Sequence, residues 1–361
     1  MKKQMLIIDR YIIRKFLGTY IFTIAMIIAI TIVIDLNQKI DNFIKTSPPI
    51  YNIIVDYYLN FIPYFINLFS PLFVFIAVIF FTSRMAENSE IIALMSSGLN
   101  FRRLLRPYMI SAVIIALSTF LLNSFVIPPG NVKRIEFENR YVRNKSVDYA
   151  SNIQLKVEPG IIARFNNFDN STRRGKGFSL ERFENKKLVS RLTAREIFWD
   201  SLYHWHVNDY MIRDFEGMKE IISSGEKLDT ILTIVPSDFL ISAHDSEQLT
   251  TPRLKAYIDR QKQRGIGNIQ LFEIEYHQRF AMSFAAFILT IIGVSLSSRK
   301  VKGGMGLNIG IGMGLSFSYI LFLQVSSTFA VSGMVNPFIA VWIPNLLFAV
   351  IAVWLYRKAP R

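Results

Sequence analysis

The sequence lacks cysteine and is short of charge for its length. Its 361 residues include no Cys, 4 His and 19% Asp, Glu, Lys and Arg. Without Cys the chain has no disulfide framework, no thiolate metal site and no Cys nucleophile. Soluble domains carry about 25% charged residues. With 51% hydrophobic residues, the chain is therefore not a purely soluble globular enzyme, a disordered chain, a collagen-like chain or a coiled coil.

Common catalytic motifs are also absent. The sequence has no G-x-x-x-x-G-K-[ST] motif for a P-loop, and neither G-x-S-x-G nor H-E-x-x-H. His204 and His206 lie two residues apart on a predicted strand and face the same way. We interpret them as part of a polar sheet face, with a partial metal site as the alternative. The sequence therefore predicts no catalytic residue, no metal site and no cofactor.

Long runs without charge are what the sequence has instead. A helix needs about 20 apolar residues to cross the hydrocarbon core of a membrane. The runs cover residues 16–34, 57–83, 107–132, 280–298 and 303–356, and the last divides near Ser332 and Pro337. The first run is too long for the core of a cleaved signal peptide. These runs predict an α-helical membrane protein with six transmembrane helices.

The net charge of +14 is concentrated on one side of this topology. Both terminal segments and the loops between spans two and three and spans four and five hold 15 basic and 3 acidic residues. Because Lys and Arg accumulate in cytoplasmic segments, both termini are predicted to be cytoplasmic. We predict no nucleic-acid binding, because that would need the basic charge on a folded soluble face.

The segment between spans three and four is nearly neutral, with 23 basic and 21 acidic residues from 130 to 275. Alternating runs bounded by turn residues predict strands. No helical pattern separates them, which favours an antiparallel sandwich or jelly roll over a parallel sheet. We therefore expect three spans, an inserted periplasmic all-β, jelly-roll-like domain, and three more spans. The strands are expected at 160–165, 177–183, 187–199, 204–215 and 227–235. The domains are expected at 1–132 (spans one to three), 133–245 (β domain), 246–272 (helical connection) and 273–361 (spans four to six).

A short amphipathic helix is predicted near residues 87–98, in the cytoplasmic loop between spans two and three. Ile91, Leu94 and Met95 form an apolar stripe along this helix. Glu90 lies at its start, and Gly98 is a natural helix stop. Such a helix suits docking to a soluble partner; a helix lying on the membrane surface is the alternative. The candidate coupling residues are Glu87, Glu90, Ile91, Leu94, Met95 and Gly98.

Two features of the spans are candidates for a gate or a substrate cavity. Gly306, Gly310 and Gly314 recur every four residues in span five, which lets another helix approach closely. Simple packing within the chain is the alternative. Asp35, near the outer end of span one, either reaches the membrane interface or lines a cavity.

A basic cluster follows the outer end of span three and fits anionic groups on a lipid. A solvated helix with internal ion pairs is the alternative, because Glu136 and Glu138 are interleaved. Glu275 and Arg279, four residues apart at the start of span four, predict an ion pair. The residues of the basic cluster are Lys133, Arg134, Arg140 and Arg143.

Several local patterns resemble those of one family. They are Ile8-Asp9-Arg10-Tyr11-Ile12, Ser89-Glu90-Ile91 with Ala93-Leu94 and Ser97-Gly98, the stretch from Glu273 to Arg279, and Ile292-Gly293-Val294 with Arg299 after it. In this order and on this topology, the chain resembles the LptF/LptG family, the permease subunits of the lipopolysaccharide exporter. The resemblance covers essentially the whole chain.

The resemblance implies an LptF–LptG-type heterodimer in a bacterial inner membrane, with spans one and five as lateral gates of a central cavity. Asp35 and the glycines of span five would border that cavity. A cytoplasmic LptB-like ATPase dimer would dock on the coupling helices, with Glu90 as an acidic contact. The β domain would project into the periplasm toward LptC-like and LptA-like proteins. ATP-driven closure would extrude lipopolysaccharide, and the chain itself would not be an enzyme.

One position departs from the family pattern. Some LptG members have a lysine near the outer end of span one where this chain has Asp35, which argues against pairing with a lipid phosphate there. Within the family we favour LptG over LptF. A membrane-anchored periplasmic scaffold without transport activity is the main alternative. A membrane enzyme acting on lipid is disfavoured, because no catalytic set is recognisable.

Overall fold

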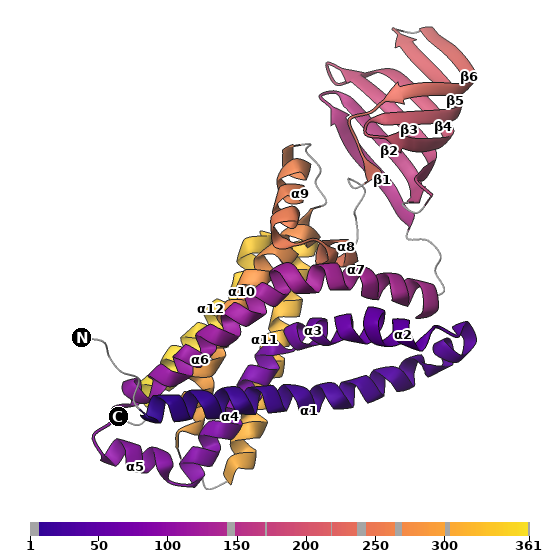
Figure 1. Ribbon diagram of the computed structural model, residues 1–361. Helices are drawn as coiled ribbons and strands as arrows, with labels where there is room; N and C mark the ends of the chain where they lie inside the picture. Colours follow the sequence, from indigo (N-terminus) through magenta and orange to yellow (C-terminus); the bar gives the residue numbers. More distant parts are fainter. Residues whose placement is uncertain are drawn as a thin grey trace. The chain divides into compact units, whose positions relative to one another are not determined.

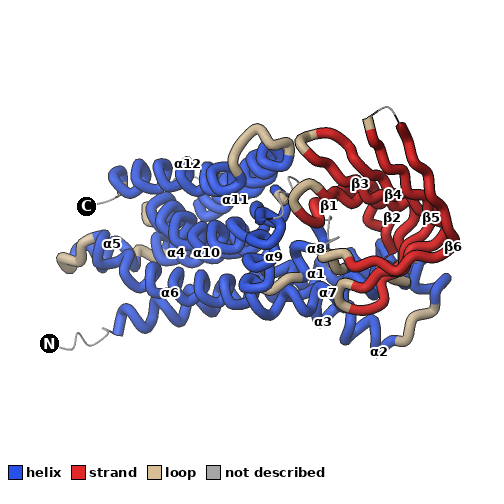
Figure 2. The backbone as a smooth tube through the Cα atoms, turned by 90° about the horizontal axis from the view of Figure 1, so that it is seen from above, coloured by secondary structure: helices blue, strands red, loops and turns tan. Residues whose placement is uncertain are grey.

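Helices and strands segregate into two units of the chain in the computed structural model (Figures 1 and 2). The helical unit comprises residues 1–137 and 273–361, and the sheet unit comprises residues 138–272. The structure describes residues 7–142, 149–169, 172–217, 219–236, 243–263, 269–299 and 304–359.

Six helical segments in the described part of the chain are long and apolar enough to cross a membrane. Three precede the sheet and three follow it, which confirms the predicted helical membrane protein with an inserted β domain. Before the sheet the elements are α1 (Ile7–Thr46), α2 (Ile50–Asn52), the π-helix η1 (Ile53–Tyr58), α3 (Leu59–Leu68), α4 (Ser70–Glu87), α5 (Glu90–Ser96), α6 (Phe101–Leu121), the π-helix η2 (Leu122–Val126), α7 (Ile127–Phe137) and the π-helix η3 (Glu138–Val142). After it come α10 (Gln270–Ser297), α11 (Gly304–Val331) and α12 (Pro337–Lys358).

The first two spans differ from the apolar runs that predicted them. Helix α1 has 40 residues, or about 60 Å at 1.5 Å per residue, twice the thickness of a hydrocarbon core. From its C-terminal end α2 and α3 turn back (Figure 1). The run 57–83 is not one helix, because α3 ends at Leu68 and α4 begins at Ser70. Pro71 explains the break, since proline fits a first helical turn but has no N–H to continue the preceding helix.

Helix α4 lies at the centre of the helical unit, where small residues let other helices approach. A Cβ atom on Gly293 of α10 would lie 2.7 Å from Val78 Cγ1, and one on Gly312 of α11 would lie 3.1 Å from the Phe75 ring. Near the end of α4, Asn308 Nδ2 donates a hydrogen bond to Ser83 Oγ at 3.2 Å. Close backbone approach and a buried polar contact are typical of packed membrane helices.

Helices α10, α11 and α12 are joined by hydrogen bonds at membrane depth. Pro344 lacks an N–H and so leaves the carbonyl of Ala340 without its helical partner. Ser326 Oγ of α11 donates to that carbonyl. One turn away, Asn345 Nδ2 donates to the Ala281 carbonyl at 2.8 Å, and its Oδ1 accepts from Tyr319 at 2.8 Å. Polar groups in lipid must be satisfied internally, and these contacts do so.

The sheet unit contains one antiparallel sheet with the strands in chain order (Figure 1). This confirms the antiparallel all-β prediction. The order of the six described strands is a meander, because each pairs with its neighbours in sequence, without the crossover connections of a jelly roll. The strands are β1 (Tyr149–Glu158), β2 (Ile161–Asp169), β3 (Arg174–Glu184), β4 (Lys187–Ser201), β5 (His204–Glu216) and β6 (Lys219–Ile231).

Two strands were misjudged from the sequence. Strand β1 was not predicted, because its Ser and Asn residues resemble a loop, but Leu155 pairs with Ala163 of β2 and both side chains are buried. Strand β6 begins at Lys219, well before the expected start at 227, and runs through Ser224 and Gly225, a pair of residue types common in turns. A Cβ atom on Gly225 would lie 2.7 Å from Tyr210 Oη. This glycine therefore allows the Tyr210 ring to lie over β6 and does not mark a turn.

One face of the sheet carries its hydrophobic core. Phe165 and Phe178 pair across β2 and β3, and their ring centroids are 5.0 Å apart. Trp205 of β5 is fully buried, and its Nε1 donates to the Ile234 carbonyl at 3.1 Å. The unit also contains α8 (Ala243–Gln248) and α9 (Thr251–Gln263). Helix α9 buries Leu254 and Ile258, and Tyr257 is half-buried.

Candidate functional site

Helix α5 is a short helix held at both ends by sharp turns. Ser89, before it, is in the left-handed conformation with φ +61°, which is uncommon for a non-glycine residue. After it Gly98 has φ +89°, the N–H of Gly98 donates to the Met95 carbonyl, and the N–H of Leu99 donates to the Leu94 carbonyl. This is a Schellman motif, which requires a left-handed residue at the position of Gly98.

The candidate coupling residues divide into a buried and an exposed group. Ile91 is buried, Leu94 and Met95 are half-buried, and all three pack on the core of the helical unit. Glu87 and Gly98 are exposed, and Glu90 is half-buried. The helix therefore lies with its apolar stripe inward. It lies at the same end of the helical unit as the beginning of α1 and the end of α12 (Figure 2).

A hollow of about 410 Å³ separates α5 from the first turns of α1 and the end of α4. Glu90 is the only charged residue among those that line it. Tyr11 Oη donates to Glu90 Oε2 at 3.4 Å, and Asn88 Nδ2 donates to Glu90 Oε1 at 3.3 Å. Each carboxylate oxygen thus has one donor, from two different elements. The hollow is lined by Ile8, Tyr11, Ile12, Met85, Glu90, Ala93, Leu94 and Ser97.

An ion pair fixes the start of α1 to the start of α6. Asp9 Oδ1 and Oδ2 accept from Arg103 Nη1 and Nη2, both at 2.7 Å. The Asp9 side chain is 8% exposed and that of Arg103 is 25% exposed. Two parallel charge-assisted hydrogen bonds define the geometry of both partners. Asp9 also lies in the first turn of α1, where a negative charge is favoured by the helix dipole.

The glycines of span five lie on an open face of α11. Gly306, Gly310 and Gly314 are exposed, and a Cβ atom on any of them would have no neighbour within 4 Å. Packing against α4 is instead made by Gly312. Within the described part of this chain, the predicted stripe therefore contacts no other helix. The position of α11 that needs a glycine for close packing is Gly312, which the four-residue spacing did not include.

Asp35 belongs to a polar cluster between α1 and η1. Its carboxylate lies 2.8 Å from Lys39 Nζ, one turn along α1. Tyr57 of η1 donates to both Asp35 oxygens, at 3.0 and 2.9 Å. Lys39 Nζ also contacts the Tyr57 hydroxyl and lies 4.2 Å from its ring centroid, a cation–π contact. Asp35 therefore ties the C-terminal part of α1 to η1.

The basic residues after span three do not form one cluster. Lys133 and Arg140 are exposed. Arg134 is buried, with its guanidinium 4.1 Å from the Tyr64 ring centroid and its Nε donating to Asn131 at 3.1 Å. Arg143 lies outside the described residues. The α7 helix turns Arg134 inward toward α3, so this residue is not at the surface of the unit.

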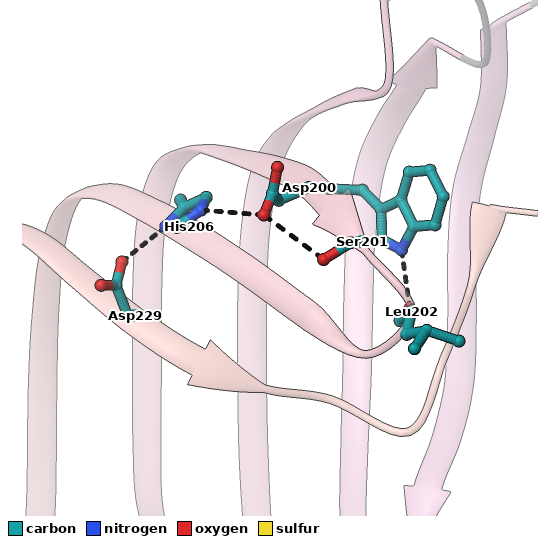
Figure 3. Close-up of polar contacts among 6 residues, drawn as sticks. Asp200, Ser201, Leu202, His206 and Asp229 are labelled. Carbon is teal, nitrogen blue, oxygen red and sulfur yellow. Dashed lines mark hydrogen bonds and ion pairs between the residues drawn. The ribbon is translucent and has the colours of Figure 1, made fainter.

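His206 lies in an exposed polar group on the sheet (Figure 3). Its Nδ1 is 2.5 Å from Asp229 Oδ1, and its Nε2 is 4.0 Å from Asp200 Oδ2. His204, two residues earlier, is exposed. Within the described ranges no group of three or more His, Asp or Glu residues is arranged to hold a metal ion. The contacts of His206 are those of a polar sheet face.

Sequence reasoning missed the partners of the charged residues. Asp9 and Arg103 were counted only as charges that indicate topology, although they form a part-buried ion pair 94 residues apart in the sequence. The contacts that Tyr11 and Tyr57 make depend equally on tertiary structure. The spacing of Glu275 and Arg279 did identify their pair, in which Nε lies 2.9 Å from Oε1. Only pairs within one helix leave such a signal in the sequence.

Comparison with known proteins gives one consistent result. The sequence profile of the family described as "Lipopolysaccharide export system permease LptF/LptG" matches residues 10–358. The chain is 20% identical over 364 residues to "Lipopolysaccharide export system permease protein LptG" from Escherichia coli strain K12, an alignment that covers 98% of each chain. The protein of the same name from Escherichia coli O6:H1 strain CFT073 gives the same identity and coverage.

Proposed function

Because this chain belongs to the LptF/LptG family of lipopolysaccharide export permeases, we propose that it is a non-catalytic permease subunit of an ABC-type exporter. In this proposal it extracts lipopolysaccharide from the bacterial inner membrane and passes it to a periplasmic bridge of LptC-like and LptA-like proteins. A partner ATPase drives the export. The E. coli relatives that match along their whole length are LptG proteins, which favours LptG over LptF.

The observation that carries the proposal is helix α5 with its half-buried acid. A coupling helix needs an inner face that transmits movement and an outer face that receives it. Ile91, Leu94 and Met95 provide the first, because they pack on the helical core. The second is provided by Glu87 and Glu90, which present negative charge to a basic partner surface. An LptB-like ATPase dimer is the partner that the family supplies, on the cytoplasmic side with both termini.

The open faces of α1 and α11 support a second permease as partner. In the most apolar stretch of α1 only 6% of the residues are buried, and in that of α11 only 28%. Gly306, Gly310 and Gly314 lie on the open side of α11, where they allow the backbone of another helix to approach. We assign these two faces to the companion LptF/LptG-type chain and to the lipopolysaccharide cavity between the two chains.

The lipid contacts are assigned to basic residues at the outer ends of the spans. Lys133 and Arg140 are exposed there and suit the phosphates of lipopolysaccharide, whereas the buried Arg134 does not. Lys39 lies one turn beyond Asp35, so a lysine is present near the outer end of span one. Its contacts with Asp35 and with Tyr57 have to open before Lys39 binds a phosphate. Movement of α1 away from η1 would release the contact with Tyr57.

The experiment that tests the proposal is a pull-down of the tagged chain from its own membranes, compared with the variant Glu90→Lys. The native chain is expected to recover a P-loop ATPase, a second six-span permease and lipopolysaccharide. Glu90→Lys should insert normally but retain about tenfold less ATPase, because like charges oppose across the interface. Glu226→Lys makes the same charge change at an exposed position on β6 and should retain all partners.

Two results would contradict the proposal. Recovery of periplasmic proteins without an ATPase would favour the membrane-anchored scaffold. Normal retention of the ATPase and normal export by Glu90→Lys would remove the assigned role of α5.

A further inference from the structure

The carboxylate of Glu90 is held by a residue of the first span. Tyr11 reaches across the hollow from α1 and donates to one oxygen, and Asn88 donates to the other. Because Asn88 lies two residues before Glu90, its contact is local. Tyr11 lies 79 residues away in sequence and therefore connects two separate elements of the helical unit.

The position of Tyr11 is itself fixed by Asp9. Successive residues of a helix are rotated by about 100°, so Asp9 and Tyr11 lie about 200° apart around α1. Asp9 faces α6 and binds Arg103 through both oxygens at 2.7 Å, while Tyr11 faces α5. The first turns of α1 thus lie between α5 and α6, attached to each by a polar contact.

Helix α1 has few other contacts that would make it follow α5. The share of buried residues in its most apolar stretch is 6%. Of its buried residues, Asp9, Ile12 and Phe16 lie in its first three turns, and Thr23 and Phe43 lie farther along. Whatever moves these turns therefore moves a long helix that is otherwise little held by its own chain. Of the residues that line the hollow, only Tyr11 gives α1 a directed contact to the acid of α5.

We propose that Tyr11 is a positioning residue for Glu90, and that their contact links the coupling helix to the first span. This inference rests on the coupling role proposed for Glu90. With the Tyr11 hydroxyl in place, the Glu90 carboxylate has one orientation, and a displacement of α5 by its partner is passed to α1. Without the hydroxyl, α5 still docks but moves independently of α1.

The test uses the full exporter, reconstituted in liposomes with lipopolysaccharide, and measures lipopolysaccharide extracted per ATP hydrolysed. Tyr11→Phe keeps the ring in the hollow and removes only the hydroxyl. We expect it to lower this ratio about two- to twelvefold, the range that the loss of one hydrogen bond produces. Retention of the ATPase should not change. Tyr51→Phe, the same change at an exposed tyrosine of α2, should leave the ratio unchanged.

A double-mutant cycle distinguishes positioning from a general structural role. In a Glu90→Gln background, Tyr11→Phe should have little further effect, because the hydroxyl acts through the carboxylate. A spin-label pair gives a direct readout, since the chain has no Cys. Labels at the exposed Ile7→Cys and Ile92→Cys should keep one distance with and without ATP. Tyr11→Phe should make that distance vary with nucleotide.

The outcomes separate this inference from the proposed function. If Glu90→Lys weakens ATPase retention but Tyr11→Phe has the same effect in the native and the Glu90→Gln backgrounds, the positioning role is wrong and the coupling role stands. An unchanged ratio and an unchanged label distance in Tyr11→Phe overturn it as well. If Glu90→Lys retains the ATPase fully, the proposed function itself fails and this inference fails with it.

Discussion

Helices α1 and α4 are both long and apolar enough to cross a membrane, but α4 is mostly buried within the chain and α1 is mostly exposed. Of the residues in the most apolar stretch of α4, 78% are buried within the chain, against 6% for α1. Yet α1 is the more apolar of the two by mean hydropathy. In a membrane, lipid chains are as apolar as leucine, so hydropathy does not select which helix becomes central. Small residues and polar contacts select it instead.

The contacts of α4 illustrate this selection. Gly293 and Gly312 bring α10 and α11 against it, and Asn308 donates to Ser83 near its C-terminal end. Helix α1 packs on the core through Ile12 and Phe16 near its start, and ion pairs and hydrogen bonds hold it at Asp9 in its first turn and at Asp35 in its C-terminal part. A helix attached in this way is suited to move as a rigid body, whereas α4 is suited to remain fixed. The following substitutions test that difference.

The largest effect is expected at the packing of α4. Gly293→Val places a methyl-bearing Cβ within 2.7 Å of Val78 Cγ1, and β-branched Val78 has little rotamer freedom to move away. Overpacking of this kind should lower the free energy of unfolding in detergent by about 2–3 kcal/mol. Gly310→Val, on the open face of α11, should change it by less than about 0.5 kcal/mol. Equal losses would show that α11 is packed on both faces.

An intermediate effect is expected at the ion pair of Asp9 with Arg103, which attaches the start of α1 to α6. Asp9→Asn leaves Arg103 without its counter-ion and should cost about 1–3 kcal/mol of unfolding free energy, less than a fully buried pair because Arg103 is 25% exposed. The exposed pair of Arg182 with Glu184 serves as control, and Arg182→Gln should cost less than about 0.5 kcal/mol. Denaturant titration of the two variants measures both. A loss at Asp9 no larger than the control would mean that α1 does not depend on this pair.

The smallest effect is expected at the hydrogen bonds between Asp35 and Tyr57, which attach the C-terminal part of α1 to η1. Tyr57→Phe keeps the buried ring and removes the hydroxyl that donates to Asp35. The expected cost is about 0.5–1.5 kcal/mol, together with faster proteolysis of the segment between α1 and α2. Tyr51→Phe, at an exposed tyrosine of α2, is the control and should cleave at the native rate. If the two variants have the same stability and the same rate of proteolysis, the C-terminal half of α1 is held by its apolar contacts alone.

The sequence alone predicted the class of protein, its six apolar spans and most of its strands, but few of their ends. Charge-free runs identified the six spans because water and lipid impose that pattern on any chain. Alternating residues identified most strands, and the i,i+4 spacing identified the ion pair of Glu275 with Arg279. It did not predict the break at Phe69, strand β1 or the inward turn of Arg134. Each of these depends on a neighbour that is distant in the sequence.

The sequence by itself therefore determined that this is a six-span helical membrane protein with an inserted β domain, together with the place of a short acid-bearing helix. Only the tertiary structure decided that Gly312 and not Gly310 contacts α4, that Asp9 binds Arg103, and that Tyr11 reaches Glu90. Partition between water and lipid is a property of each segment and can be read locally. Contacts between segments depend on how the helices pack, and no single segment records them.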